Sequence, residues 1–379
     1  MLESRTLLSH CTRVIVKVGS SLLTDNGKRL DHDYIDSLTA QIQALRQMKK
    51  DVALVSSGAV AAGITVLSIA RPDDIRLKQA TAAVGQSRLM HAYERAFQSK
   101  GIHVAQLLVT HDDLANRRRF LNARNTLSGL LELDVLPVIN ENDTVVVDEI
   151  KCGDNDNLSA MVTTLLEADL LIILSDVGGL YDGDPRKISG AQRIPVVERI
   201  DARIEELAGG SSSGIGTGGM ITKVEAAKRA GALGVPTVIA DGREPEVLRK
   251  ILAGEDLGTL FLPTDERLAN RKHWIAYTLR PMGRLFLDEG CVAAVKERGT
   301  SLLPSGVKSI DGDFGRGDAV SLCAENGAEF ARGLTEYGAD EMRRILGKRT
   351  AEIERILGYK YTDEVVNRDD LVLLPTLKT

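Results

Sequence analysis

The chain has 379 residues, of which 43% are hydrophobic and 27% are charged, as in an ordinary globular protein. Its formal net charge of −5 at pH 7 does not suggest a surface for nucleic acid or for anionic lipid. The four cysteines stand far apart, and no apolar run is long enough for a signal peptide or a membrane span, so we expect a cytoplasmic protein with reduced thiols.

Short runs of β-branched residues recur along the chain, and each is followed by small or polar residues and then by a helical pattern. The runs are RVIVKVGSS (13–21), DVALVSSGA (51–59), HVAQLLVT (103–110), DVLPVINEND (134–143), DLLIILSD (169–176) and VPTVIAD (235–241). Helical patterns lie between them, at 34–49, 76–99 and 157–168. This alternation predicts an α/β fold, a three-layer αβα sandwich with a mostly parallel central sheet covered on both faces.

Polar residues gather where these predicted strands end. In a parallel sheet, ligands bind beyond the carboxyl ends of the strands, so these residues should share one edge. They are Lys17, Gly19, Ser56, Ser57, Asn140 to Asp143, Ser175 and Asp176. The segment GDNDN (153–157) follows and opens a helical pattern, for which a single polar cap is enough. Its other polar residues are therefore candidates for the same crevice.

A second glycine-rich segment, GIGTGGMITK (214–223), also leads into a helical pattern. GIGTGG matches the dinucleotide fingerprint, with Asp241 at a suitable distance, but a helix and a loop precede it where the fingerprint requires a strand. No P-loop motif occurs, and DFG (313–315) lacks the other protein-kinase motifs. Each of Lys17 and Lys223 alone could be a solvated lysine. Together they could place two cations on a transferring phosphoryl group.

The pattern changes after about residue 264. We predict a linker with its own helix at 264–279, and then short strands and glycine turns that form a small, mostly-β domain at 280–360. A last polar helix is expected at 340–356, and residues 361–379 are expected to form a C-terminal tail.

Eight segments of the chain carry a family resemblance. They are VKVGSS, VSSGAVAAG, AAVGQSRLM, RRRFLNARNTL, PVINENDTV, GDNDNLSA, LSDVGGLYDGDPR and GTGGMITKVEAAKRAG. In this order they resemble the glutamate 5-kinases of the amino acid kinase family, and the second domain resembles a PUA domain. The resemblance implies an amino acid kinase domain at 1–263 and ATP-dependent phosphorylation of the γ-carboxylate of L-glutamate, with Mg²⁺, as the first step of L-proline biosynthesis.

The resemblance also assigns roles to individual residues. Lys17 and Lys223 would be catalytic, with Asp156 holding the two lysines in position. Asp143 would pair with the substrate's α-ammonium, while Ser57 and Asn155 would donate hydrogen bonds to its carboxylates. The ATP-binding residues would be Lys17, Ser175, Asp176, Thr217, Gly218, Gly219, Met220, Ile221, Thr222 and Lys223. Asp154 would cap the helix or meet magnesium through water, and no protein ligand of Mg²⁺ is assigned.

The resemblance further implies inhibition by proline at a site overlapping that of glutamate, a homo-oligomer, and functional coupling to glutamate-5-semialdehyde dehydrogenase. Acetylglutamate kinases, aspartokinases and uridylate kinases would share the lysines and glycine loops, but should lack the NEND–GDNDN pair and the PUA-like domain. RNA binding through that domain is a further alternative. Residues 281–359 hold 11 Lys and Arg against 13 Asp and Glu, the wrong balance for a phosphate-binding surface, so a nucleic-acid partner is not expected.

Overall fold

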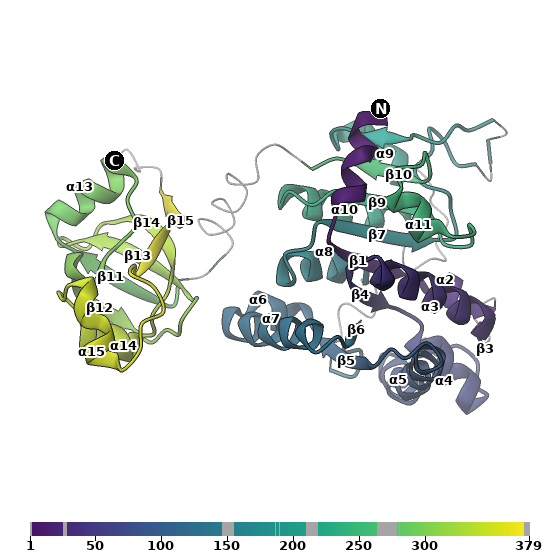
Figure 1. Cartoon of the computed structure of the whole chain (residues 1–379), viewed down its shortest axis with the longest axis horizontal. Helices are drawn as coiled ribbons and strands as arrows, with labels where there is room; N and C mark the ends of the chain where they lie inside the picture. The colour runs from purple at the N-terminus through teal and green to yellow at the C-terminus, as the bar shows by residue number, and fades with distance from the viewer. Residues whose placement is uncertain are drawn as a thin grey trace. The chain divides into compact units, whose positions relative to one another are not determined.

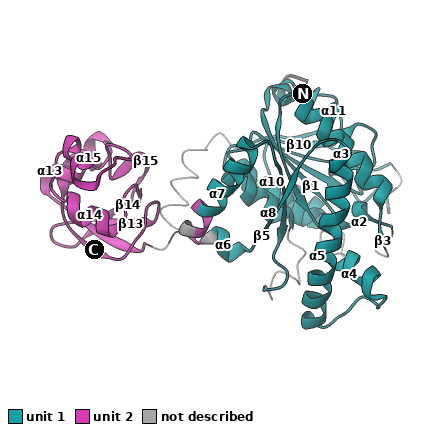
Figure 2. Ribbon diagram, turned by 60° about the horizontal axis from the view of Figure 1, so that its bottom comes forward, with its two compact units in different colours: residues 1–115, 122–265 teal, residues 116–121, 266–379 magenta. Residues whose placement is uncertain are grey.

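The computed structural model describes residues 2–25, 29–145, 155–185, 187–188, 190–209, 219–263, 279 and 281–374. The chain divides into two compact units, shown in different colours in Figure 2. The first holds residues 1–115 and 122–265, and the second holds residues 266–379 together with 116–121. Thr217, Gly218, Asp154 and nearly all of the predicted linker lie outside the described residues.

The first unit is built on an eight-stranded sheet with the order β5-β6-β4-β1-β7-β9-β10-β8. All six predicted strands are present. Neighbouring strands are parallel, except that β10 runs antiparallel to β9. The strands are β1 (Arg13–Val18), β4 (Asp51–Ser56), β5 (Val104–Val109), β6 (Leu136–Glu141), β7 (Leu170–Ser175), β8 (Val196–Val197), β9 (Thr237–Asp241) and β10 (Thr259–Phe261). Strands β8 and β10 were not predicted, because two or three residues give no readable pattern.

Helices cover both faces of this sheet. The helices are α1 (Leu2–Thr6), α2 (Ser20–Leu23), α3 (His32–Gln47), α4 (Ala59–Leu67), α5 (Ile75–Gln98), α6 (His111–Ala115), α7 (Arg117–Glu132), α8 (Asn155–Leu165), α9 (Ala202–Gly209), α10 (Met220–Ala232) and α11 (Val247–Leu252). A 3₁₀ turn (Leu7–His10) follows α1, and a small hairpin joins β2 (Thr24–Asp25) to β3 (Arg29–Leu30). Figures 1 and 2 place α3 and α11 on one side of the sheet and α8 and α10 on the other, which confirms the predicted three layers.

The side chains of β1 point alternately to the two faces of the sheet. Val14, Val16 and Val18 lie in the fully buried cluster that also contains residues of α3, α5 and α11. Because successive side chains of a strand point to opposite faces, Lys17 points to the face covered by α8 and α10. A lysine in an otherwise apolar strand is thereby directed toward the helix that begins at Asn155.

Helices α4 and α5 cross at glycines. A Cβ atom on Gly63 would lie 1.9 Å from the Thr81 carbonyl oxygen, and one on Gly85 would lie 1.8 Å from the Ala59 carbonyl oxygen. Real Cβ atoms do not approach this closely, so any larger residue would push the two helices apart. The glycines of VSSGAVAAG and AAVGQSRLM therefore fix α5 against the segment that follows β4.

The second unit has a five-stranded sheet with the order β12-β11-β13-β14-β15. Its elements are β11 (Gly283–Leu287), α13 (Glu289–Arg298), a 3₁₀ turn (Pro304–Gly306), β12 (Val307–Gly312), β13 (Ala319–Ala324), β14 (Glu329–Thr335), α14 (Ala339–Ile345), a 3₁₀ turn (Thr350–Glu352), α15 (Ile353–Leu357) and β15 (Val366–Leu373). The small, mostly-β second domain is thus present, with its own buried core.

Two predictions for this unit were wrong. The helix expected at 340–356 is two short helices separated by Gly347, whose φ of +67° is left-handed and ends a helix. Part of the segment expected to be a C-terminal tail is β15, which pairs with β14. Val366 and Leu371 of that strand are buried in the core, so residues 366–373 belong to the domain.

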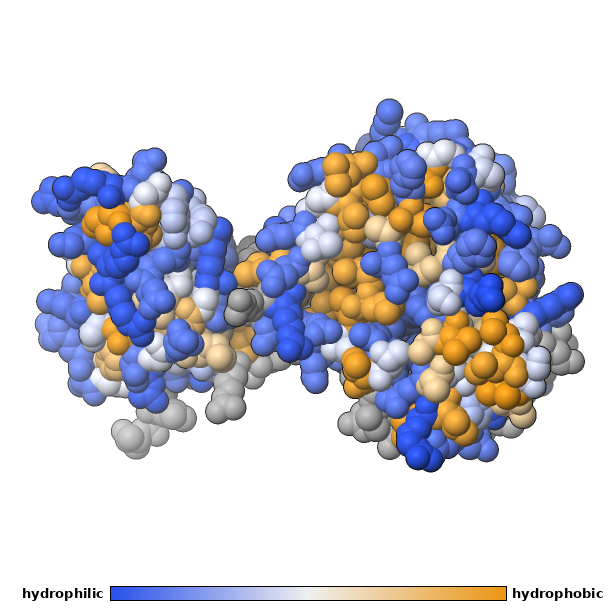
Figure 3. Space-filling model, turned by 90° about the horizontal axis from the view of Figure 1, so that it is seen from below, coloured by the Kyte–Doolittle hydropathy of each residue, from blue (hydrophilic) through white to orange (hydrophobic). Residues whose placement is uncertain are grey.

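Among the described residues, no helix is long and apolar enough to span a membrane. Apolar side chains do gather on part of the surface of the first unit, over α4 and the beginning of α5 (Figure 3). The exposed residues there are Val66, Leu67, Ile69 and Leu77.

Candidate active site

Four neighbouring strands bring the predicted site residues to one edge of the sheet. The order β6-β4-β1-β7 is uninterrupted and parallel, so the carboxyl ends of these strands are adjacent. Asn140 and Glu141 end β6, Ser56 ends β4, Lys17 is the next-to-last residue of β1, and Ser175 ends β7. The shared edge predicted from the sequence is confirmed.

Three charged side chains meet beyond the end of β1. Lys17 Nζ lies 2.5 Å from Asp156 Oδ1, and Lys223 Nζ lies 3.1 Å from Asp156 Oδ2. Asp156 is fully buried, and the two lysines are 4% and 5% exposed. The three residues come from β1, the first turn of α8 and the first turn of α10, so they meet only in the folded chain.

The cluster joins one carboxylate to two ammonium groups. Burial alone would raise the pKa of Asp156, but the ammonium groups of Lys17 and Lys223 outweigh burial and lower the pKa to about 2. The carboxylate is therefore ionised at neutral pH and faces two cations. Two ammonium groups held in fixed positions at the sheet edge suit the binding of a phosphate group.

Thr222 connects this cluster to the glycine-rich segment. Its Oγ1 is 2.7 Å from Asp156 Oδ2, to which it donates, and 2.9 Å from the Gly219 carbonyl oxygen. Gly219 is the N-cap of α10. In the first turn of that helix, Met220 is half-buried and Ile221 is exposed, and Lys223 follows them. The hydroxyl of Thr222 thus contacts Asp156, which the sequence had not suggested.

The amino-acid end of the predicted site is a cluster of amides and hydroxyls. Asn155 Nδ2 lies 2.9 Å from Ser57 Oγ, 2.9 Å from Asn140 Oδ1 and 3.2 Å from the Ser56 carbonyl oxygen. An amide nitrogen carries only two hydrogens, so these contacts occupy both. In this structure the NH₂ group of Asn155 is therefore used within the protein, and the predicted donation to a substrate carboxylate stays a prediction. Its side-chain oxygen, which only accepts, is the atom left for a ligand.

Two carboxylates lie at the end of β6, that of Glu141 in its last residue and that of Asp143 two residues later. Burial raises the pKa of Asp143 to about 6, and the neighbouring carboxylate of Glu141 adds to the rise. Glu141 is only 6% exposed, and its Oε1 lies 3.7 Å from Nδ1 of His111. A cation bound here would relieve the repulsion between the two acids, as an α-ammonium group would do.

At the other end of the edge, Ser175 and Asp176 follow β7. Ser175 is buried and its hydroxyl donates to Asp176 Oδ1 at 3.2 Å, whereas Asp176 is exposed. Both residues lie on the side of β1 away from Asn140, because β7 and β6 flank the pair β1 and β4 from opposite sides. Among the described residues, no group of three His, Cys, Asp or Glu could hold a metal ion.

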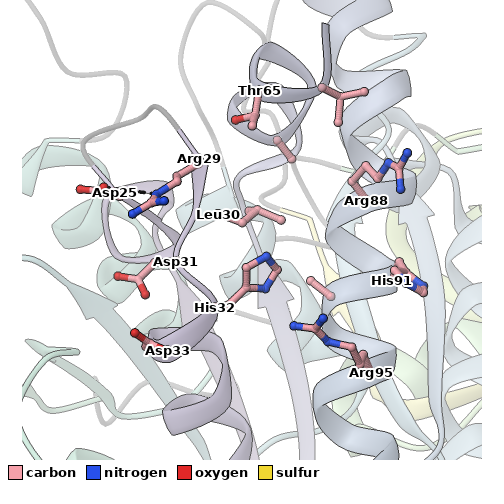
Figure 4. Close-up of a pocket in the computed structure, with 13 residues that line it drawn as sticks. Asp25, Arg29, Leu30, Asp31, His32, Asp33, Thr65, Arg88, His91 and Arg95 are labelled. Carbon is pink, nitrogen blue, oxygen red and sulfur yellow. Dashed lines mark ion pairs between the residues drawn. The ribbon is translucent and has the colours of Figure 1, made fainter. Parts of the chain in front are cut away.

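A separate groove of about 780 Å³ lies between the β2–β3 hairpin and helices α4 and α5 (Figure 4). Its lining includes Arg88 and Arg95 of α5 and Asp31 and Asp33 at the start of α3. In Figure 4, His32 and Arg95 point toward one another across it. None of the predicted site residues lines this groove, so it is distinct from the cluster at the sheet edge.

The profile of the amino acid kinase family matches residues 12–241, and that of the PUA domain matches residues 283–357. The chain is 57% identical over 370 residues to the glutamate 5-kinase of Syntrophotalea carbinolica, covering 97% of this chain and 99% of that protein. It is 54% identical over 369 residues to the glutamate 5-kinase of Geobacter sulfurreducens, with 97% and 99% covered. The enzyme of Chromobacterium violaceum is 52% identical over 363 residues, with 96% and 98% covered. These similarities extend through both units.

Proposed function

Because this chain belongs to the glutamate 5-kinase family of amino acid kinases and carries their PUA domain, we propose that it transfers the γ-phosphoryl group of ATP to the γ-carboxylate of L-glutamate. The product is L-glutamyl 5-phosphate, and the reaction is the first step of L-proline biosynthesis. The single observation that best supports this chemistry is the pair of buried lysines held on the carboxylate of Asp156.

The reaction needs positioning and charge neutralisation more than acid–base chemistry. A carboxylate oxygen of glutamate forms a bond to the γ-phosphorus, the bond between that phosphorus and the β–γ bridging oxygen breaks, and ADP leaves with the electron pair. The nucleophile is already ionised at neutral pH, so no general base is required. The obstacle is repulsion between two anions, and Lys17 and Lys223 reduce it with charge that is oriented before the substrates arrive.

The order of the strands supports a separate place for each substrate. Ser57, Asp143 and Asn155 belong to the β6–β4 side and would bind glutamate, with Asp143 taking the α-ammonium and the Ser57 hydroxyl donating to a carboxylate. Ser175, Asp176 and the first turn of α10 lie toward β7 and would bind ATP. Lys17 lies between the two groups, where the γ-carboxylate and the γ-phosphate would meet.

The described residues do not form a magnesium cage of their own. Both oxygens of Asp156 are bound by lysines, and no three His, Cys, Asp or Glu side chains among the described residues lie close enough together to hold a metal ion. Mg²⁺ usually keeps several waters and binds phosphate oxygens. We therefore propose that it binds chiefly through the phosphates of ATP, and no step is assigned to a protein-bound ion.

We also propose that proline inhibits by competing for the glutamate site, since both molecules carry the same α-amino acid group. The exposed apolar residues over α4 and the beginning of α5 favour a homo-oligomer in which a second copy covers them. Functional coupling to glutamate-5-semialdehyde dehydrogenase remains a proposal that follows from the family, because an acyl phosphate hydrolyses readily and benefits from prompt reduction.

Trapping the acyl phosphate tests the proposed reaction. With ATP, Mg²⁺ and hydroxylamine, the protein should form a hydroxamate from L-glutamate but not from L-aspartate or N-acetyl-L-glutamate. Turnover of N-acetylglutamate in place of glutamate would instead indicate an acetylglutamate kinase. Proline should reduce the yield, and added glutamate should restore it. Failure of glutamate to relieve the inhibition would exclude overlapping sites.

A further inference from the structure

Three side-chain amides form a connected chain at the amino-acid end of the site. Gln86 of α5 accepts a hydrogen bond from Asn140 Nδ2 of β6 at 2.8 Å. Asn140 Oδ1 in turn accepts from Asn155 Nδ2 of α8 at 2.9 Å. Asn155 continues to Ser57 Oγ, also at 2.9 Å. Gln86 lies in the segment AAVGQSRLM, whose sequence alone assigns it no role.

Backbone groups fix the orientation of every amide in this chain. The Glu141 N–H donates to Asn140 Oδ1 at 2.9 Å, so the oxygen of Asn140 must face that N–H, and its NH₂ group must face Gln86. Gln86 therefore presents its oxygen to Asn140. The Ser56 carbonyl accepts from Asn155, which fixes the NH₂ group of Asn155 in the same way. A flip of any amide would place two donors or two acceptors against each other.

Within the described part of the chain, this arrangement leaves two buried polar atoms without a hydrogen-bond partner, Nε2 of Gln86 and Oδ1 of Asn155. Leaving a buried polar group without a partner is energetically costly, so folded proteins rarely keep one unless a ligand or water completes its hydrogen bonds. One atom can only donate and the other can only accept. Together they match the two charged groups of an α-amino acid, the carboxylate and the ammonium.

The backbone holds Gln86 firmly at this place. It follows Gly85, whose missing side chain lets α5 lie directly against the Ala59 carbonyl at the start of α4. Helix α4 itself begins just after Ser57, so the contact ties Gln86 to the strand that carries the site. A donor held in this way loses little conformational freedom when it binds a ligand.

We propose that Gln86 Nε2 binds the α-carboxylate of glutamate and so helps to select an α-amino acid over other carboxylates. The assignment to the α-carboxylate follows from the order of the strands. Gln86 contacts Asn140 of β6, whereas the γ-carboxylate has to reach Lys17 on β1, with β4 lying between these two strands. This inference rests on the proposed function, because it names a further binding residue of the same site.

Two glutamate analogues can test which group Gln86 binds. 4-Aminobutyrate keeps the γ-carboxylate and the ammonium and lacks only the α-carboxylate, whereas glutarate lacks only the ammonium. Gln86→Met should lower kcat/KM for glutamate about 10- to 100-fold, the value of a hydrogen bond to a charged group. The same substitution should change kcat/KM for 4-aminobutyrate by less than about 3-fold, since the lost contact is absent there. Gln86→Met should lower kcat/KM for glutarate by the same factor as for glutamate, because both substrates carry the α-carboxylate.

A second variant separates two roles of Gln86, binding of the substrate and acceptance of the hydrogen bond from Asn140. Gln86→Glu keeps an oxygen for Asn140 but replaces the donor with an acceptor that repels a carboxylate. It should raise the glutamate KM by at least about 10-fold and leave the ATP KM within about 3-fold. Gln98→Met, the matched change at the exposed end of the same helix, should behave as the unmodified protein.

The outcomes distinguish this inference from the proposed function. An unmodified protein that forms no glutamate hydroxamate would overturn the proposed function. If the unmodified protein is active, an equal loss of kcat/KM on glutamate and 4-aminobutyrate in Gln86→Met would overturn the proposed role of Gln86. An unchanged glutamate KM in Gln86→Glu would also overturn it. The role of Gln86 is supported if Gln86→Met loses kcat/KM on glutamate and glutarate but not on 4-aminobutyrate, and if Gln86→Glu has a raised glutamate KM.

Discussion

Lys17 and Lys223, which lie far apart in the chain, contact opposite oxygens of one buried carboxylate, that of Asp156. Each lysine is nearly inaccessible to solvent, so neither is oriented by water. The carboxylate contacts both ammonium groups and fixes their relative position. This arrangement suits phosphoryl transfer, because the cationic groups are already in place when two anions have to approach.

Replacing Lys223 should slow the chemical step. Lys223→Ala removes one cation from the site, and kcat should fall by roughly 10²–10³-fold, as when other preorganised donors are lost. The hydroxamate assay at saturating substrates measures this change. Lys228→Ala is a suitable control, since Lys228 lies on the same helix but pairs with Glu205 at the surface. A folded Lys223→Ala variant with normal kcat would contradict the assignment.

Replacing Asp156 should destabilise the fold as well as abolish activity. Asp156→Asn removes the carboxylate that pairs with two buried ammonium groups, which should lower the free energy of unfolding at pH 7 by about 3–5 kcal/mol. Urea titration of the first unit's transition would measure the loss. Asp73→Asn, at an exposed position, should leave the free energy of unfolding unchanged.

The effect of Asp156 on stability should also depend on pH with a defined sign. Its pKa in the folded protein is about 2, below its ordinary value of 3.8. Its contribution is therefore fully present above pH 3.8 and is lost as the pH falls through about 2. The difference in free energy of unfolding between the unmodified protein and Asp156→Asn should shrink over this window. A difference that stays constant there would indicate that the lysines do not act through the ionised carboxylate.

Glutamate binding should weaken in mild acid. The pKa of Asp143 is raised to about 6, so its carboxyl group becomes protonated as the pH falls below that value and can no longer pair with an ammonium group. The plot of kcat/KM for glutamate against pH should therefore bend downward near pH 6, because this ratio reports the titration of the free enzyme. In Asp143→Asn the bend should disappear and the glutamate KM should rise far more than the ATP KM. Equal increases of both would argue against a substrate contact.

The N-terminal segment should be important for stability through Arg5. This side chain is 2% exposed, and its guanidinium donates to the carbonyl oxygens of Glu255, Leu257, Pro195 and Gly258 at 2.8–2.9 Å. Arg5→Met would remove these four hydrogen bonds from a charged donor and should lower the free energy of unfolding by about 3 kcal/mol. Urea unfolding measures this, with exposed Arg71→Met as the control. Equal stability of both variants would show that water replaces the lost donors.

Some features could be predicted because the pattern that encodes them is local. The six long strands of the first unit are continuous apolar runs, and a run of this kind is readable without knowing its neighbours. Strand β8 has only two residues, which is too short for a strand pattern to be recognised. The sequence of β15, VNRDDLVL, has charged residues in its middle and therefore does not indicate a buried strand. Burial of Val366 and Leu371 against a domain core, not their immediate sequence, makes that segment a strand.

The sequence by itself determined the αβα layering and the edge at which the ligands should bind, since parallel strands bring their carboxyl ends together whatever their order. Only the tertiary structure decided which atoms of that edge are available. It showed that the NH₂ group of Asn155 is already occupied and that Thr222 contacts Asp156. It also showed that Gln86 Nε2 is a buried donor with no partner among the residues that the structure describes. The reason is physical: an amide turns to suit backbone groups from other elements, and the distances between those elements are set by packing such as the contact of Gly85 with Ala59.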